Sequence, residues 1–204
     1  MNSSSHPIRL QRGVTCDFVD ALLHERIDGA YARRVDDIWL TYLAAAQARA
    51  NAAGRSFGDL EHAHWSWHAK VAESARLLSC PTLAIECDGE PQGLMLIKTD
   101  GHFSTLPAEQ GKPLVYVTYL ATAPWNLSGV VDQPRYRGIG TLLTRAAVQV
   151  CLEAEFKGRI GLHSLPQAEG FYERHGFMCL GVDVDKESLK YYELSPQAAA
   201  AFVK

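Results

Sequence analysis

The sequence of 204 residues lacks several features that would assign it to a specialised class. It contains no internal repeat, and no low-complexity tract apart from a short alanine-rich tail, so solenoid and fibrous architectures are not expected. The net charge of -3 provides no overall attraction to nucleic acid, although it leaves room for a local basic patch. With 47% hydrophobic residues, the chain can bury the core of one ordinary globular domain.

Signals for secretion, disulfide bonding and membrane insertion are also missing. The five cysteines include no C-x-x-C pair and are odd in number, which is typical of reduced thiols in the cytosol. The first residues, MNSSSHPIRLQ, contain no apolar core of a signal peptide. The uncharged stretch between Lys112 and Asp132 does not suit a membrane helix, because it is interrupted by Pro113, Thr118, Pro124, Asn126 and Ser128. We therefore expect a cytoplasmic protein with no membrane partner.

Between Leu114 and Leu143 the sequence reads as a strand, a loop and then RYRGIG opening an amphipathic helix. The helical stripe consists of Ile139, Leu142, Leu143, Ala146, Ala147, Val150 and Ala154. The first turn of such a helix presents backbone N–H groups and the positive end of the macrodipole. Because Gly138 and Gly140 carry no Cβ, a ligand can approach the backbone closely. This arrangement predicts an anion site, and a phosphate group fits it well.

The missing residues narrow the kind of phosphate ligand. A P-loop requires a Gly-Lys-Ser/Thr ending, and none follows Gly140. The dinucleotide-binding fingerprint requires a third glycine where Leu143 stands. Nucleotide hydrolysis and NAD binding are therefore disfavoured.

RYRGIG resembles the Q/R-x-x-G-x-G/A pyrophosphate loop of the GCN5-related N-acetyltransferase (GNAT) superfamily. Downstream, QAEGFYERHGF is similar to the A-x-x-x-Y-x-x-x-G-F segment of that family, and one predicted strand, residues 159–163, separates the two motifs. The pair is more specific than either motif alone, and the resemblance spans residues 82–194. The matching positions of the second motif are Ala168, Tyr172, Gly176 and Phe177.

The resemblance implies acetyl-CoA as co-substrate and no metal. The main chain of Leu120, Ala121 and Thr122 would contact the pantetheine arm. The implied pyrophosphate loop consists of Arg135, Tyr136, Arg137, Gly138, Ile139, Gly140 and Thr141. Two departures stand out: Tyr136 replaces the first glycine of the common R-G-x-G-x-G loop, and the usual CoA-binding asparagine after the next strand is absent. Ser164 or Gln167 would substitute for it, and Ala168, Phe171 and Tyr172 would complete the cofactor set.

The resemblance also implies that Tyr172 acts as the general acid for the departing CoA sulfur. A phenol, with an ordinary pKa near 10, can supply a proton to a thiolate whose pKa is near 8.5. The alternative is a core tyrosine beside Phe171. The general base is open, because the strand before the loop offers Tyr116, Thr118 and Tyr119 but no acid. The candidates are Glu86, Glu169, a water chain or His163, the last of which is alternatively a hydrogen-bonded structural histidine.

The N-terminal part carries no recognised motif, but it contains the cluster HWSWH. His64 and His68 are helical neighbours, yet the glutamate of H-E-x-x-H and a third ligand are missing, so no metal site is predicted. Trp67 shares a stripe with core residues, whereas Trp65 faces the other way. Trp65 either lines an acceptor pocket, together with Tyr119, or packs against the first helix or a second subunit.

The predicted fold class is α/β, a GNAT-like mixed and splayed central sheet flanked by helices on both faces. Helices are expected at residues 35–53, ended by Gly54, at 60–78, capped by Asp59, and at 197–203 after Ser195-Pro196. Strands are expected near residues 8–12, 83–87, 92–98, 114–123, 159–163, 177–182 and 190–194. We expect one domain over 1–204, with a helical acceptor-side part at 1–80, an acetyl-CoA-binding part at 82–194 and a tail helix at 195–204.

Taken together, these features predict an N-acetyltransferase that moves an acetyl group from acetyl-CoA to a primary amine by direct attack. Cys87 and Cys179 are the only rivals for a covalent route, and neither has an adjacent His or Asn signature. The alternative is a non-catalytic acyl-CoA-binding sensor or scaffold with the same fold. The acceptor stays open between a polyamine, an amino acid, an aminoglycoside and a protein amine. A homodimer is consistent with the resemblance, and no nucleic-acid partner is expected.

Overall fold

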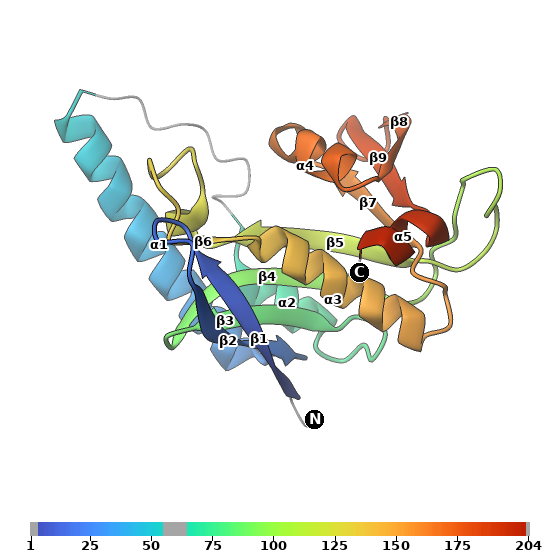
Figure 1. Ribbon diagram of the computed structural model, residues 1–204, viewed down its shortest axis with the longest axis horizontal. Coiled ribbons are helices and arrows are strands. Elements are labelled where there is room, and N and C mark those ends of the chain that lie inside the picture. Colours follow the sequence, from blue (N-terminus) through green and yellow to red (C-terminus); the bar gives the residue numbers. More distant parts are fainter. Residues whose placement is uncertain (1–3, 55–64, 203–204) are drawn as a thin grey trace. The chain divides into compact units, whose positions relative to one another are not determined.

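The computed structural model describes residues 4–54 and 65–202 (Figure 1). Its strands are β1 (Ser5–Arg12), β2 (Phe18–Glu25), β3 (Thr82–Cys87), β4 (Glu90–Lys98), β5 (Val115–Thr122), β6 (Tyr136–Arg137), β7 (Ile160–Ser164), β8 (Met178–Asp183) and β9 (Leu189–Leu194). They form a mixed, mostly antiparallel sheet with the order β6-β1-β2-β3-β4-β5-β7-β9-β8, flanked by helices. The mixed α/β class is as predicted. The chain divides into two compact units, Met1–Met95 with Leu120–Leu143 and Leu96–Tyr119 with Thr144–Lys204.

In the first unit, β1 and β2 form an antiparallel hairpin, and β2 continues onto β3 with Leu23 opposite Ile85. No strand was predicted between residues 12 and 83, in the part expected to be helical, but Phe18–Glu25 is a strand. The segment DALLHE contains residues that favour helices when considered alone. Backbone pairing on both edges of β2 overrides that preference, since strand formation depends strongly on cross-strand context.

Two helices belong to the first unit, α1 (Gly29–Ala52) and α2 (Trp67–Ser74). The backbone N–H of Tyr31 donates to the side chain of the N-cap Asp28, and α1 ends before Gly54, which has a φ of +64°, as predicted. The predicted second helix is shorter than expected and is capped by Ser66; Asp59, the predicted cap, lies outside the described residues. The carboxylate of Asp36 accepts from the N–H groups of Trp67 and His68, which attaches α2 to α1.

The predicted hairpin of β3 and β4 is present. Asp88 and Gly89 form its two-residue turn, with φ of +53° and +73°. Positive φ at both central positions matches the right-handed twist of the flanking strands, which is why Asp-Gly pairs favour such turns. The interior of β4 is buried from Pro91 to Ile97.

In the second unit, β7 pairs in parallel with β5, Val117 lying opposite Leu162, and antiparallel with β9, which pairs with β8. The short α4 (Glu169–Arg174) follows β7, and α5 (Pro196–Phe202) begins as predicted, with the Ala198 N–H donating to Ser195 Oγ at 3.2 Å. The buried side chain of Arg159 donates to Glu109 and to the Pro113 carbonyl, both at 2.8 Å. None of the described helices is long and apolar enough to span a bilayer.

Candidate active site

The predicted phosphate loop begins with a short strand and ends in a helix. Tyr136 pairs with Arg12 of β1, and Arg137 pairs with Gln11. Gly138 then takes a φ of +80°, and α3 (Ile139–Glu153) starts at the next residue. The N–H of Leu142 donates to the carbonyl of Gly138 at 2.9 Å, which is the first turn of the helix. The positive end of the α3 macrodipole therefore lies directly after the glycine turn.

A glycine that the sequence analysis did not single out lets this helix approach the sheet. A Cβ on Gly93 of β4 would lie 2.5 Å from Cγ2 of Ile139 and 3.1 Å from Cδ1 of Leu143. Any larger residue would push the first turn of α3 away from β4. Ile139 is accordingly buried, so within the loop motif it serves packing through its side chain.

Tyr136 occupies the place of the glycine in the common family loop. Its backbone is extended in β6, so no positive φ is required there. Its ring is buried, and its hydroxyl donates to Asp88 in the β3–β4 turn at 2.9 Å. Burial, with Cys87 and Asp88 nearby, raises the pKa of this phenol. The side chain thus anchors the loop to the hairpin.

Arg135 does not extend freely toward a ligand. Its guanidinium forms an ion pair with Glu90 at 2.8 Å and lies 4.8 Å from the centre of the Trp125 ring. Arg137, the other arginine of the motif, is exposed. The first arginine is thus held by a contact within the unit, whereas Arg137 is exposed.

The buried side chain of Gln92 stabilises the segment that leads into the loop. Gln92 Oε1 accepts from Trp125 Nε1 at 2.8 Å and from Asn126 Nδ2 at 3.1 Å, and its Nε2 donates to the Glu90 carbonyl at 3.1 Å. Asn126 Oδ1 in turn accepts from the N–H of Tyr136 at 2.9 Å. The residues between the strand and the motif are thus fixed by buried polar contacts, which no sequence pattern indicated.

The three strand residues predicted for pantetheine, Leu120, Ala121 and Thr122, end β5. Thr122 also lines a small pocket with Trp65, which is half-buried, and with Trp39 and Trp67 of the helices. The rings of Trp65 and Trp67 meet edge to face, with centroids 6.2 Å apart. Trp67 is in the core as predicted. Trp65 therefore lies at the end of the predicted cofactor strand within the same unit.

In the second unit, the Y-x-x-x-G-F motif forms the C-terminal cap of α4. Gly176, with a φ of +81°, donates its N–H to Glu173, and the N–H of Phe177 donates to the carbonyl of Tyr172, both at 3.1 Å. These two bonds define a Schellman cap, which is normally accompanied by an apolar contact across it. The rings of Tyr172 and Phe177 supply that contact, with centroids 5.3 Å apart. The motif spacing thus fixes the position of Tyr172.

Tyr172 is buried among aromatic rings, including Phe171 and Tyr192, and this burial alone raises the pKa of its phenol. No described residue forms a hydrogen bond with its hydroxyl. Ser164 is buried and donates its hydroxyl to the Leu165 carbonyl at 2.9 Å, so that side chain already has an acceptor. Ala168 and Gln167 lie on the short 3₁₀ turn between β7 and α4.

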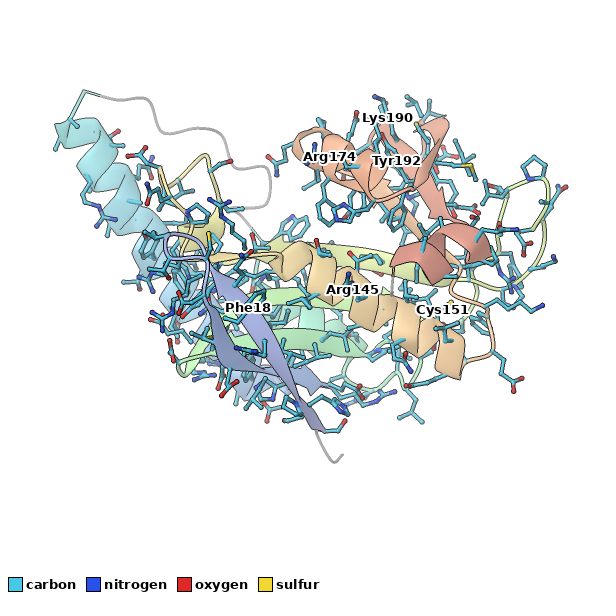
Figure 2. All side chains as sticks on the ribbon, viewed as in Figure 1. Phe18, Arg145, Cys151, Arg174, Lys190 and Tyr192 are labelled. Carbon is cyan, nitrogen blue, oxygen red and sulfur yellow. The ribbon has the colours of Figure 1, made fainter. Side chains whose placement is uncertain are left out.

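Both carboxylates predicted as bases have cationic partners. Glu86 pairs with Arg34, whose guanidinium lies over the ring of Tyr31. Glu169 pairs at 2.6 Å with Lys190 of β9, which Figure 2 labels beside Arg174 and Tyr192. A proton arriving at either carboxylate would have to displace an ion pair. Tyr119 is half-buried in β5.

The histidine pair of the HWSWH cluster is only partly described. His64 lies outside the described residues. The Nδ1 of His68 lies 3.1 Å from the Gly29 carbonyl, and its Nε2 lies 3.0 Å from the Arg33 guanidinium. Both ring nitrogens thus have partners, and the described residues include no cluster of ligands suited to a metal. All five cysteines are free thiols.

Comparison with known families shows what the C-terminal half of the chain is similar to. Residues 101–195, just under half of the chain, match the family described as "Acetyltransferase (GNAT) domain". This match and the fold confirm the resemblance to the GNAT superfamily that the two motifs indicated. Residues 101–195 are therefore similar to a GNAT acetyltransferase domain. No curated protein matches it at the level of sequence.

Solved structures with the same fold include three acetyltransferases of low sequence identity. A GNAT-family acetyltransferase from Listeria monocytogenes 4b F2365 is 13% identical, with a TM-score of 0.55 over 92% of this chain and 99% of that chain. Aminoglycoside acetyltransferase AAC(6')-Ib, in complex with coenzyme A and kanamycin, is 18% identical, with a TM-score of 0.54 over 88% and 98%. The PaiA N-acetyltransferase from Thermoplasma acidophilum, in complex with coenzyme A, is 15% identical, with a TM-score of 0.50 over 84% and 97%.

Proposed function

We propose that the protein is an N-acetyltransferase that transfers the acetyl group of acetyl-CoA directly to a primary amine. The observation that carries the proposal is the sharp turn at Gly138, which directly precedes α3 and where a Cβ would meet no atom within 4 Å, so that a ligand can approach the start of the helix. The GNAT domain supports acetyl transfer, and fold relatives bound to coenzyme A support a CoA-based donor. No metal enters the proposed reaction.

Coenzyme A would contact two sets of residues. The main chain of Leu120–Thr122 would bind the pantetheine arm. The N–H groups at the start of α3 and the guanidinium of Arg137 would bind the pyrophosphate, because charge-assisted hydrogen bonds to an anion are strong. Phe171 and the turn at Gln167 would complete the cofactor contacts. Trp65 and Tyr119 are proposed on the acceptor side.

Tyr172 is proposed as the acid that serves the departing sulfur. Its raised pKa keeps the hydroxyl protonated across the ordinary assay range, so it can donate to sulfur as negative charge develops there. Because no described residue occupies that hydroxyl, it is available to a ligand. Glu86 and Glu169 remain candidates for the base, but either carboxylate would have to lose its ion pair to accept a proton.

Replacing Tyr172 by Phe tests the proposal, because the ring and its packing are kept and only the hydroxyl is removed. We expect acceptor-dependent thiol release to fall about 10²- to 10⁴-fold, while the affinity for coenzyme A stays within about twofold. The melting temperature of the variant serves as the control for folding. If the unmodified protein binds coenzyme A but releases no thiol with any amine, it is a sensor or scaffold instead.

A further inference from the structure

Three side chains of the second unit form a continuous hydrogen-bonded row across its strands. The hydroxyl of Tyr116 on β5 lies 2.7 Å from Nδ1 of His163 on β7. Nε2 of His163 lies 2.9 Å from Oδ2 of Asp183 on β8. Strand pairing sets this row, since Tyr116 lies opposite Gly161 and His163 lies opposite Tyr191. A Cβ on Gly161 would lie 2.6 Å from the hydroxyl of Tyr191, so the absence of a side chain there makes room for the Tyr191 ring beside His163.

The chemistry of the three groups determines which atom donates and which accepts in each hydrogen bond of the row. An ionised carboxylate only accepts, so the Nε2 of His163 carries the hydrogen that Asp183 binds. In the neutral imidazole Nδ1 is then a bare acceptor, and the Tyr116 hydroxyl donates to it. When the imidazole is protonated, Nδ1 donates and the Tyr116 oxygen accepts. The row therefore has one place for an additional proton, and its two ends are the Tyr116 oxygen and the Asp183 carboxylate.

We propose that Tyr116, His163 and Asp183 form the proton relay that deprotonates the acceptor amine. The inference rests on the proposed acetyltransferase function. An ammonium group gives one proton to the Tyr116 oxygen while Tyr116 passes its own proton to Nδ1 of His163. The freed nitrogen lone pair forms the C–N bond, and the C–S bond breaks with its electron pair on sulfur. Tyr172 protonates the departing sulfur, the second amine proton restores the Tyr172 hydroxyl, and the imidazolium returns its proton to water.

The surroundings suit this role. Burial and the charge of Asp183 raise the pKa of Tyr116 to about 12, so the phenol conducts the proton and does not hold the charge. Titratable groups near the row, among the described residues, include His102, whose ring centroid lies 4.3 Å from that of Tyr116, and Tyr191, whose ring lies 4.9 Å from that of His163. Tyr119 also interacts electrostatically with Tyr116. Burial, together with Lys98, lowers the pKa of His102, which keeps it uncharged near neutral pH; Asp100 opposes this and Lys186 adds to it.

The relay also differs from the two candidate carboxylates. Asp183 binds His163 and the N–H of Asp185, and among the described residues it forms no ion pair with a lysine or an arginine. Its side chain is 36% exposed, and that of His163 is 10% exposed, so the row is sheltered but reaches water at the Asp183 end. Glu86 and Glu169 are each held by a cation. Unlike Glu86 and Glu169, the relay can accept a proton without first breaking an ion pair with a lysine or an arginine.

The experiment measures the pH profile of kcat/KM for thiol release, with spermidine, L-lysine and kanamycin as amine probes. In Y116F, H163Q and D183N we expect kcat to fall about 10²- to 10⁴-fold, while coenzyme A affinity is unchanged. The base-dependent limb of the pH profile should be lost in H163Q. The matched control is Y191F, since that ring lies beside His163 but outside the hydrogen-bonded row, and it should keep the profile.

Two results overturn the relay while leaving the acetyltransferase proposal intact. One is full activity with an unchanged pH profile in Y116F and H163Q; the other is loss of the base-dependent limb in E86Q or E169Q instead. Nitrogen-15 NMR of the unmodified protein gives a readout that needs no variant to fold, because the relay requires the hydrogen of neutral His163 on Nε2. A hydrogen on Nδ1 overturns it. Absence of amine-dependent thiol release from the unmodified protein instead removes the proposed function itself.

Discussion

A methyl group at Gly138 separates the structural role of the phosphate loop from its ligand-binding role. In this chain a Cβ at Gly138 would meet no atom within 4 Å, so Gly138→Ala creates no clash. Its cost to folding is that of placing alanine at a φ of +80°, about 1–2 kcal/mol. Gly101 is a matched control, since it has a φ of +71° and also no atom within 4 Å of a Cβ. Both variants should therefore lose similar stability in urea.

The two variants should differ in affinity for coenzyme A. If the pyrophosphate lies against the backbone of the loop, the new methyl group displaces one charge-assisted hydrogen bond, worth about 1.5–3 kcal/mol. At 1.4 kcal/mol per tenfold, this corresponds to a Kd about 10- to 100-fold weaker for Gly138→Ala. Calorimetric titration with coenzyme A measures it, and Gly101→Ala should bind like the unmodified protein. Equal affinity in both variants would refute the placement of the pyrophosphate at this loop.

Two further predictions concern stability. Gln92→Leu leaves the buried donors of Trp125 and Asn126 without their acceptor and should lower the free energy of unfolding by about 2–4 kcal/mol in urea; the exposed Gln149→Leu should change it by less than about 0.5 kcal/mol. The pKa of Glu109 is held below its ordinary value of 4.5 by a hydrogen bond from Lys112 and then by Arg159. Because the folded value is depressed, this stabilisation is present above pH 4.5 and is lost as the pH falls through the folded pKa. Melting curves of Glu109→Gln should therefore depend less on pH below 4.5, and an unchanged acid limb would contradict the assignment.

The parts of the fold that local patterns encode were predictable from the sequence. The end of α1 at Gly54, the Asp88-Gly89 turn and the start of α5 after Ser195 each depend on a cap or turn residue and its immediate neighbours. The strand β2 was missed because its residues favour a helix, and its strand conformation comes from pairing with β1 and β3. Pairing between strands that are distant in the sequence produces no local periodic pattern from which the strand could be predicted.

In the candidate site, too, the locally encoded features were predictable and the long-range contacts were not. The spacing of Tyr172, Gly176 and Phe177 is that of a helical cap, so the motif and its geometry are one local unit. The partner of Arg135 is Glu90, 45 residues away, so no local pattern around Arg135 indicates that its guanidinium forms an ion pair. The row from Tyr116 to Asp183 joins three strands through contacts 47 and 20 residues apart, and only the folded sheet brings these residues together.

The central claim is that the start of α3 after Gly138 binds the pyrophosphate of coenzyme A. Its most direct test is a pair of calorimetric titrations of the full chain, one with coenzyme A and one with pantetheine, which carries the same thiol arm without the nucleotide and its phosphates. The account predicts saturable binding of coenzyme A and binding of pantetheine at least about 100-fold weaker. Failure of coenzyme A to bind, or equal binding of the two compounds, would contradict it.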